Sequence, residues 1–157
     1  MDKNKIEAFA KIPQPPQSEW GFIDDIKSPL EYHFDDSRGC DAGVNSDCLA
    51  NGIRIVSEFG GTLPETAFVS LRRVLKAKGI EETENGYQVM IREVPEFSHE
   101  EYELITKPDS AVIRAKDTDG LRRAVYALED QICAAAGKSL MPCSMRKKPF
   151  VDRKSVV

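Results

Sequence analysis

Two alternating apolar segments, separated by a short turn that contains proline, constrain the fold of this chain more than any other feature. Within residues 101–106 and 111–116, apolar and polar side chains alternate with the period of two that is typical of β-strands. The residues between them, Lys107-Pro108-Asp109-Ser110, place proline where a type I turn favours it. Strands joined by so short a turn pair antiparallel, so this segment predicts a β-hairpin.

An amphipathic helix is predicted to follow the hairpin directly. It would begin at Asp117-Thr118-Asp119-Gly120 and end at Gly137, because glycine is a natural C-terminal stop. Apolar residues recur with helical spacing along this segment, as expected for a helix with one buried stripe. The residues of the stripe are Leu121, Ala124, Val125, Leu128 and Ile132.

A strand–helix–strand unit is predicted earlier in the chain. Residues 52–59 form the first strand, and Gly60-Gly61 breaks it. The helix would start at Thr62-Leu63-Pro64-Glu65, where Thr62 and Glu65 have the spacing of a capping box and Pro64 lies in the first turn. Gly79 would end the helix, and the second strand covers residues 87–92. The expected buried stripe of the helix is Ala67, Phe68, Leu71, Val74 and Leu75.

These elements predict an α+β fold, a two-layer sandwich in which a mixed β-sheet carries two helices packed on one face. The expected domain spans residues 20–145 and includes a further candidate strand at residues 30–34. Residues 1–19 form a lead segment and a proline-rich linker, because each proline removes a backbone donor. Residues 146–157 form a basic exit segment toward a downstream domain that the chain lacks.

Composition excludes several classes of function. The net charge of −4 and the pI near 5.3 argue against a nucleic-acid partner and against binding to anionic membranes. No apolar run approaches the length of about 20 residues that spans a bilayer. The N-terminus has no signal-peptide core, so the expected location is the cytoplasm. The four cysteines form no CxxC pair and are expected to be free thiols, with Cys133 on a buried helix face.

The sequence contains three possible ligand sites and favours none of them. His33 lies near Asp35, Asp36 and Cys40, but this spacing matches no zinc pattern. Residues 41–52 place oxygen side chains at the first, fifth and seventh positions of a calcium loop. The required glycine and the final glutamate of that loop are missing. The Gly60-Gly61 junction before a helix resembles a phosphate site only faintly, and the glycines are expected simply to make the turn.

Two acidic groups and a basic run complete the candidate chemistry. The first acidic group is Glu81, Glu82 and Glu84, and the denser one is Glu96, Glu100, Glu101 and Glu103 around His99. Both are expected to be solvated acidic edges. Cys133 has no neighbouring base and is not expected to be a nucleophile. The basic residues are expected to form a solvated connector: Arg146, Lys147, Lys148, Arg153 and Lys154. No catalytic residue, metal or cofactor is therefore predicted.

Residues 101–132 resemble the β-hairpin-plus-helix module of the N-terminal, non-catalytic domain of family 20 glycoside hydrolases, the β-hexosaminidase-like enzymes. Similar domains precede the barrels of family 67 and family 84 enzymes. The resemblance lies in Glu101–Thr106, Ser110–Asp117 and the helix from Gly120 to Ile132, and its glycine suits a close approach of helix to strand. Pro149–Arg153 weakly resembles the segment that leads into the barrel.

The resemblance implies an accessory domain that packs against a catalytic barrel and supports it. A (β/α)₈ barrel needs roughly 250 residues, so the barrel would lie outside this chain and no catalytic residue carries over. The alternative is a stand-alone carbohydrate- or protein-binding module, in which exposed aromatic residues would contact the ligand. Its candidate residues are Trp20, Tyr32, Phe34 and Tyr87. A third hypothesis is a small enzyme with a site around His33.

Overall fold

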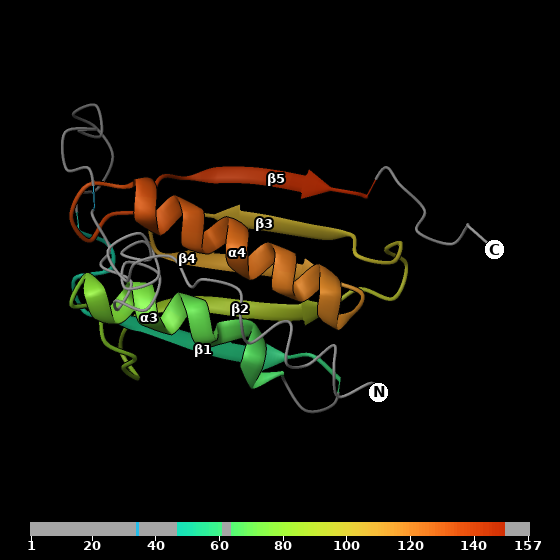
Figure 1. Cartoon of the computed structure of the whole chain (residues 1–157), viewed down its shortest axis with the longest axis horizontal. Coiled ribbons are helices and arrows are strands. Elements are labelled where there is room, and N and C mark those ends of the chain that lie inside the picture. Colours follow the sequence, from blue (N-terminus) through green and yellow to red (C-terminus); the bar gives the residue numbers. More distant parts are fainter. Residues whose placement is uncertain (1–33, 35–46, 61–63, 150–157) are drawn as a thin grey trace, which may run out of the picture. The chain divides into compact units, whose positions relative to one another are not determined.

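Five β-strands form one sheet in the computed structural model, which describes residues 34, 47–60 and 64–149. Figure 1 shows the spatial order of the strands as β1-β2-β4-β3-β5. The strands are β1 (Ile53–Glu58), β2 (Tyr87–Glu93), β3 (Tyr102–Thr106), β4 (Ser110–Ala115) and β5 (Cys143–Lys147).

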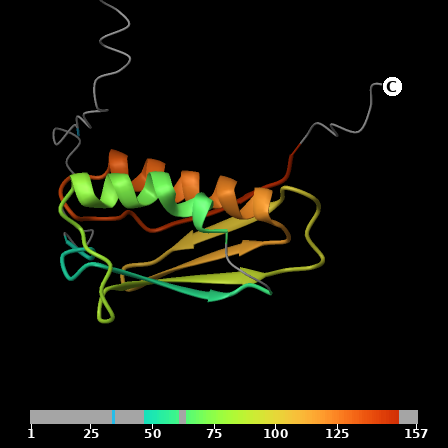
Figure 2. The ribbon, with the colours of Figure 1, turned by 60° about the horizontal axis from the view of Figure 1, so that its bottom comes forward.

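Two helices cover one face of this sheet. They are α3 (Val69–Ala77), which directly follows the 3-10 turn η2 (Glu65–Phe68), and α4 (Thr118–Ala134). Figure 2 shows both helices side by side on the same side of the strands. The expected α+β two-layer sandwich, with both helices on one face, is therefore confirmed.

The sheet is mixed, as the sequence predicts. β1 pairs parallel with β2, and β2 pairs parallel with β4. β3 pairs antiparallel with β4 in the expected hairpin, and its other edge pairs antiparallel with β5. The hairpin thus enters the sheet through its second strand, and β5 completes the sheet on the far side of β3.

The core lies between the sheet and the helices, and both predicted helical stripes are buried in it. The strands contribute the alternate residues expected to face inward. Ile53, Val89, Ile91, Leu104, Ala111 and Ile113 each have an exposed fraction of 1% or less. Burial of these apolar side chains is the main stabilising term for such a domain.

The opposite face of the sheet carries an apolar row that no helix of the described residues covers. Val56 pairs with Met90, Met90 with Val112, and Val112 with Ile105 in the strand register. All four side chains are half-buried. A neighbouring row is charged and contains the ion pairs Arg92–Glu58 at 3.1 Å and Arg114–Glu103 at 2.7 Å.

The two helices begin differently. The N-cap of η2 is Pro64, which makes no side-chain capping bond, so Pro64 precedes the first turn instead of lying in it. Thr62, the other half of the expected capping box, lies outside the described residues. α4 begins within the predicted residues 117–120, and Asp117 is its N-cap, because its carboxylate accepts a hydrogen bond of 2.8 Å from the N–H of Gly120.

Gly120 brings α4 against the chain just before β3, as the resemblance implies. A Cβ atom at this position would lie 2.7 Å from the backbone oxygen of Glu101, a contact that backbone atoms cannot easily relieve. We therefore expect Gly120→Ala to lower the free energy of unfolding by about 1–2 kcal/mol. Urea denaturation measures this free energy. Ala127→Gly is the control, because it changes the helix propensity of α4 and does not affect the contact with Glu101. Unchanged stability in Gly120→Ala would contradict the close approach.

Several predictions fall outside the described residues. The lead segment and linker at residues 1–19 lie there, as do residues 30–33 of the candidate first strand, and Phe34 belongs to no strand. The domain limits therefore stay a prediction. At the C-terminal limit, Arg146 and Lys147 belong to β5. Within the described part of the chain, no helix has the length and apolar character needed to cross a bilayer.

Candidate functional site

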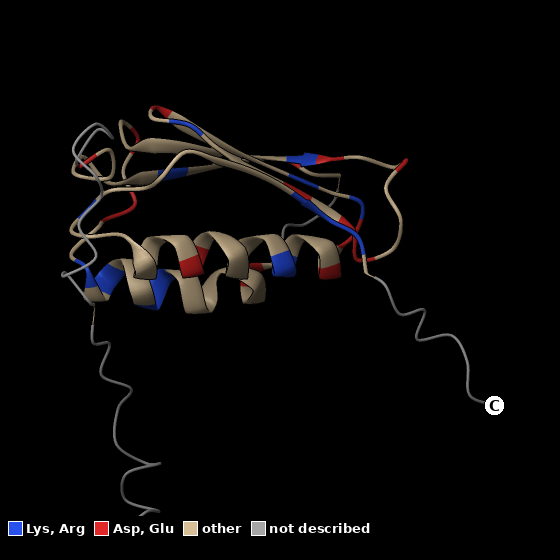
Figure 3. Cartoon of the chain, turned by 90° about the horizontal axis from the view of Figure 1, so that it is seen from above, with Lys and Arg blue, Asp and Glu red and all other residues tan. Residues whose placement is uncertain are grey.

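Charged side chains gather where the loop before β3 meets the start of α4. Acidic and basic residues lie close together at this end of the domain (Figure 3). The loop supplies His99, Glu100 and Glu101, the first turns of α4 supply further groups, and Arg146 comes from β5. The hairpin register and the close approach at Gly120 bring these segments together.

Asp117 is the centre of this polar end. Its second carboxylate oxygen lies 2.7 Å from Nδ1 of His99 and accepts a hydrogen bond of 3.0 Å from the N–H of Glu100. Burial alone would raise the pKa of Asp117, but the backbone N–H groups of Gly120 and Glu100, together with His99, hold it below its usual value. One carboxylate therefore fastens the loop to the helix that it caps.

Glu101 is buried, with an exposed fraction of 4%. Its carboxylate accepts a hydrogen bond of 2.6 Å from the N–H of Ser98 and pairs with Arg146 at 2.8 Å. The N–H of Ser98, followed by the guanidinium of Arg146, lowers the pKa of Glu101. The Arg146 guanidinium also lies 4.4 Å from the centre of the Phe97 ring.

The expectation of a solvated acidic edge is therefore wrong for this group. Glu101 is buried and paired, and Glu103 and Glu100 pair with arginines at 2.7 Å and 2.6 Å. The sequence could not show this, because the partners of these carboxylates come from β4, α4 and β5. The other acidic group, Glu81, Glu82 and Glu84, is exposed as expected.

The acid dependence of stability tests the Glu101 contact. A lowered folded pKa means that Glu101 stabilises the fold above its usual pKa of about 4.3, and that this contribution is lost as the pH falls through the folded value. We expect Glu101→Gln to be less stable than wild type at pH 6, and the difference to shrink toward pH 3. Urea midpoints measure it, and Glu96→Gln, an exposed carboxylate of the same loop, is the matched control. A constant difference across this range would contradict the prediction.

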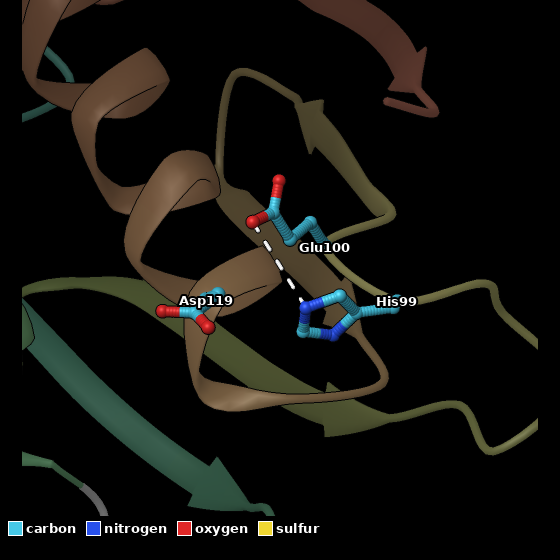
Figure 4. Close-up of side chains that lie close together, drawn as sticks. All are labelled: His99, Glu100 and Asp119. Atoms are coloured by element: carbon cyan, nitrogen blue, oxygen red, sulfur yellow. Dashed lines mark ion pairs between the residues drawn. The ribbon is translucent and has the colours of Figure 1, made fainter. Parts of the chain in front are cut away.

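His99, Glu100 and Asp119 place three possible metal ligands within 4.8 Å of one another (Figure 4). The two carboxylates already have cationic partners, however. Glu100 pairs with Arg123 at 2.6 Å and Asp119 with Arg122 at 3.3 Å. The N-terminal end of a helix also carries a partial positive charge. A metal ion here would compete with two arginines and a helix dipole, so the arrangement favours ion pairing over metal binding.

A groove of about 380 Å³ lies next to this polar end, between α4 and the end of β5. Tyr102 lines it from β3, and Tyr126 is exposed along α4 with an exposed fraction of 47%. The other residues that line the groove are Glu100, Arg123, Ala127, Asp130, Lys147, Lys148 and Pro149. This site was not identified from the sequence. One signal was present: Tyr126 follows Val125 directly and does not belong to the buried stripe of the helix, so its ring is expected to face solvent.

The possible ligand sites of the sequence lie mostly outside the described residues. His33, Asp35, Asp36 and Cys40 all lie there, as do positions 41–46 of the possible calcium loop. Of the glycine pair, Gly60 is described, and its N–H donates a hydrogen bond of 2.9 Å to the Glu93 carboxylate. This N–H is therefore already occupied and does not support a phosphate site.

Of the aromatic residues expected in a binding module, the structure describes Tyr87 and Phe34, and these two do not form an exposed patch. Tyr87 is buried, and its hydroxyl donates to the backbone carbonyl oxygens of Lys107 and Ser110, which lie 2.7 Å and 2.6 Å from it. Burial raises its pKa. Phe34 packs partly against the core below the Lys78 ammonium, and Trp20 and Tyr32 lie outside the described residues. The prediction is wrong for Tyr87.

Cys133 lies on α4, the helix expected for it, but its side chain is half-buried and not fully buried. Burial raises the pKa of its thiol, which keeps it in the neutral and poorly nucleophilic form. The structure therefore gives no support to covalent chemistry at this residue.

No protein-family model and no curated protein matches the chain, but solved structures do. A GH20 exo-β-N-acetylglucosaminidase from Vibrio harveyi, solved in complex with N-acetylglucosamine, is 18% identical with a TM-score of 0.50. The match covers 78% of this chain and 19% of that enzyme. The described domain therefore has a fold that occurs in part of a glycoside hydrolase.

Two further matches are weaker. A GH138 enzyme targeting pectin rhamnogalacturonan II is 17% identical, with coverage of 59% and 15% and a TM-score of 0.48. A β-N-acetylhexosaminidase from Bacteroides fragilis NCTC 9343 is 17% identical, with coverage of 52% and 16% and a TM-score of 0.39. This chain spans less than a fifth of each of these enzymes.

Proposed function

We propose that this chain is a non-catalytic accessory domain of a glycoside hydrolase, and that it packs against and supports a catalytic barrel in the same polypeptide. The observation that carries the proposal is the partial match to the Vibrio harveyi enzyme, in which 78% of this chain corresponds to 19% of that one. A domain that accounts for so small a part of an enzyme leaves room for a separate catalytic domain.

The chemistry of the polar end agrees with a supporting role. The carboxylates of Glu100, Glu101 and Glu103 each face an arginine, and Asp117 binds backbone N–H groups. A glycosidase needs one carboxyl group that is protonated and another that is free to act as base or nucleophile. The pKa values of Glu101 and Asp117 are lowered, which favours their ionised form, so this cluster is better suited to fastening the loop to α4.

The apolar row on the outer face of the sheet also supports a packing role. Val56, Met90, Val112 and Ile105 adjoin one another across four strands. Contiguous apolar surface of this kind is typical of an interface. Salt-bridged residues border the row, as in interfaces with an apolar centre and a polar rim.

The size of the native protein is the first test. We expect immunoblotting and intact-mass measurement of the protein from its source cells to give a chain well above 17.5 kDa, long enough to add a barrel of roughly 250 residues. A native protein of 17.5 kDa without a barrel-containing partner would remove the proposal.

Turnover by the isolated chain is the second test. We expect residues 1–157 to release no nitrophenol from aryl N-acetyl-β-glucosaminides or other aryl glycosides, whereas the longer protein does. Deleting the domain from the longer protein should lower the thermal midpoint of the barrel. Measurable turnover by the isolated chain that disappears in Glu100→Gln would show instead that this chain is catalytic.

A further inference from the structure

The groove between α4 and β5 has the features of a binding site, and neither the ion-pair cluster nor the packing role accounts for them. Most aromatic side chains of the described domain lie in or against the core, but Tyr126 presents nearly half of its surface to solvent. Ala127, the next residue along α4, also lines the groove and has only a small side chain. A flat aromatic surface with an open space next to it can stack against a planar or ring-shaped ligand.

Tyr102 provides a second and independent observation. Its side chain is buried, with an exposed fraction of 6%, and it lines the groove. Burial raises its pKa, and the charges of Arg123 and Asp130 also act on it. Its hydroxyl makes no hydrogen bond with any residue that the structure describes. Because Tyr102 lines the groove, this hydroxyl is available to a ligand there.

Positively and negatively charged side chains surround the rings of Tyr102 and Tyr126. Arg123, Lys147 and Lys148 give three positive charges, and Glu100 and Asp130 give two negative ones, a net charge of +1 on the lining. Arg123 and Glu100 pair with each other, but no ion pair joins Lys147, Lys148 or Asp130 to another described residue. Lys147 lies directly opposite Tyr102 in the β3–β5 register, so both contribute to the same part of the groove.

We propose that this groove binds an acidic sugar, the uronate unit of an oligosaccharide. Its apolar ring face would stack on Tyr126, its hydroxyl groups would bond to the Tyr102 hydroxyl and the Asp130 carboxylate, and its carboxylate would pair with Lys147. A pyranose ring offers an apolar face and a rim of hydroxyl groups, which matches an aromatic ring bordered by donors and acceptors. The surplus of ammonium groups favours a sugar with a negative charge over a neutral one.

The test uses the 157-residue chain and three probes: trigalacturonate, the neutral sugar chitotriose, and inorganic phosphate. ¹H–¹⁵N spectra should show saturable shifts with trigalacturonate at the amides of β5 and the central part of α4, and weaker or no shifts with the other two. Chitotriose binding as tightly as trigalacturonate would overturn the assignment to an acidic sugar. Equal shifts with phosphate would overturn it as well, because they would indicate simple attraction of anions.

Matched variants locate the site. Tyr126→Ala should weaken trigalacturonate binding about tenfold, whereas Tyr126→Phe, which keeps the ring, should bind as wild type does. Tyr102→Phe removes one hydroxyl and should weaken binding about threefold to tenfold. Lys147→Gln should reduce the preference for trigalacturonate over chitotriose. Tyr126 is exposed, so its variants are expected to fold, and the spectrum without sugar verifies this.

Two results would overturn the proposal: no saturable shift at about 10 mM trigalacturonate, or unchanged affinity in Tyr126→Ala. The inference does not depend on the accessory role. A native protein without a barrel would remove the role in packing and leave this groove to be tested. Absence of sugar binding would remove the site and leave the packing role intact.

Discussion

Replacing Leu104 by alanine is expected to lower the free energy of unfolding by about 3 kcal/mol, the largest effect of any single change considered for this domain. Leu104 has no exposed surface and lies in β3, between Ile113 of β4 and Met145 of β5. α4 packs over the same strand. Because neighbours close the site on every side, the removed methyl groups would leave a cavity, and the cost of the cavity adds to the lost burial.

Urea denaturation of the isolated chain measures this effect. Ile105→Ala is the matched control, because Ile105 is the next residue of the same strand but lies half-buried on the outer face. Ile105→Ala is expected to lower the free energy of unfolding by about 1 kcal/mol, since no second layer packs over Ile105 in the described domain. Equal losses for the two variants would mean that β3 is buried on both faces, for example in an oligomer.

Replacing Asp117 by alanine is expected to lower the free energy of unfolding by about 2 kcal/mol. The carboxylate caps α4 through Gly120 and also binds the N–H of Glu100 and the ring of His99. Alanine would therefore leave two backbone donors without their partner and release the loop before β3. Asp117→Asn keeps one acceptor oxygen for the cap and is expected to lose about half as much.

Two measurements distinguish this role from a general loss of negative charge. Asp119→Ala removes a half-exposed carboxylate of the same helical turn, and urea denaturation is expected to show a change below about 0.5 kcal/mol. Amide exchange of Glu100 and Gly120 should accelerate in Asp117→Ala well before the remainder of α4. Stability that falls equally in both variants would contradict the bridging role of Asp117.

The hairpin, both helical stripes and the fold class could be predicted because they depend on local periodicity. Leu121 to Ile132 repeat with the helical period, and Ala111 and Ile113 alternate with the strand period, whatever lies elsewhere in the chain. The order of the strands in space could not be predicted in this way. β4 lies between β2 and β3, and residues 87–115 alone do not specify which strand of the hairpin pairs with β2.

The candidate site could not be predicted from the sequence either, because it depends on which distant segments meet in space. In the sequence, Glu101 is one of several neighbouring acidic residues. Its burial depends on Arg146, which lies 45 residues later in the chain. In the sequence, Tyr102 is one residue of an alternating strand pattern, and nothing in that pattern indicates a binding role. Its open hydroxyl becomes apparent only when β5 and α4 bring Lys147 and Asp130 beside it.

The position of β5 also has a consequence for the order in which a nascent chain can fold. β3, β4 and α4 are contiguous between residues 102 and 134 and need only local contacts to assemble. Until Cys143–Lys147 have left the ribosome, however, one edge of β3 keeps unpaired backbone groups that can pair with another chain. β5 then replaces this apolar edge with one that carries Arg146 and Lys147, and charged edges of this kind oppose aggregation.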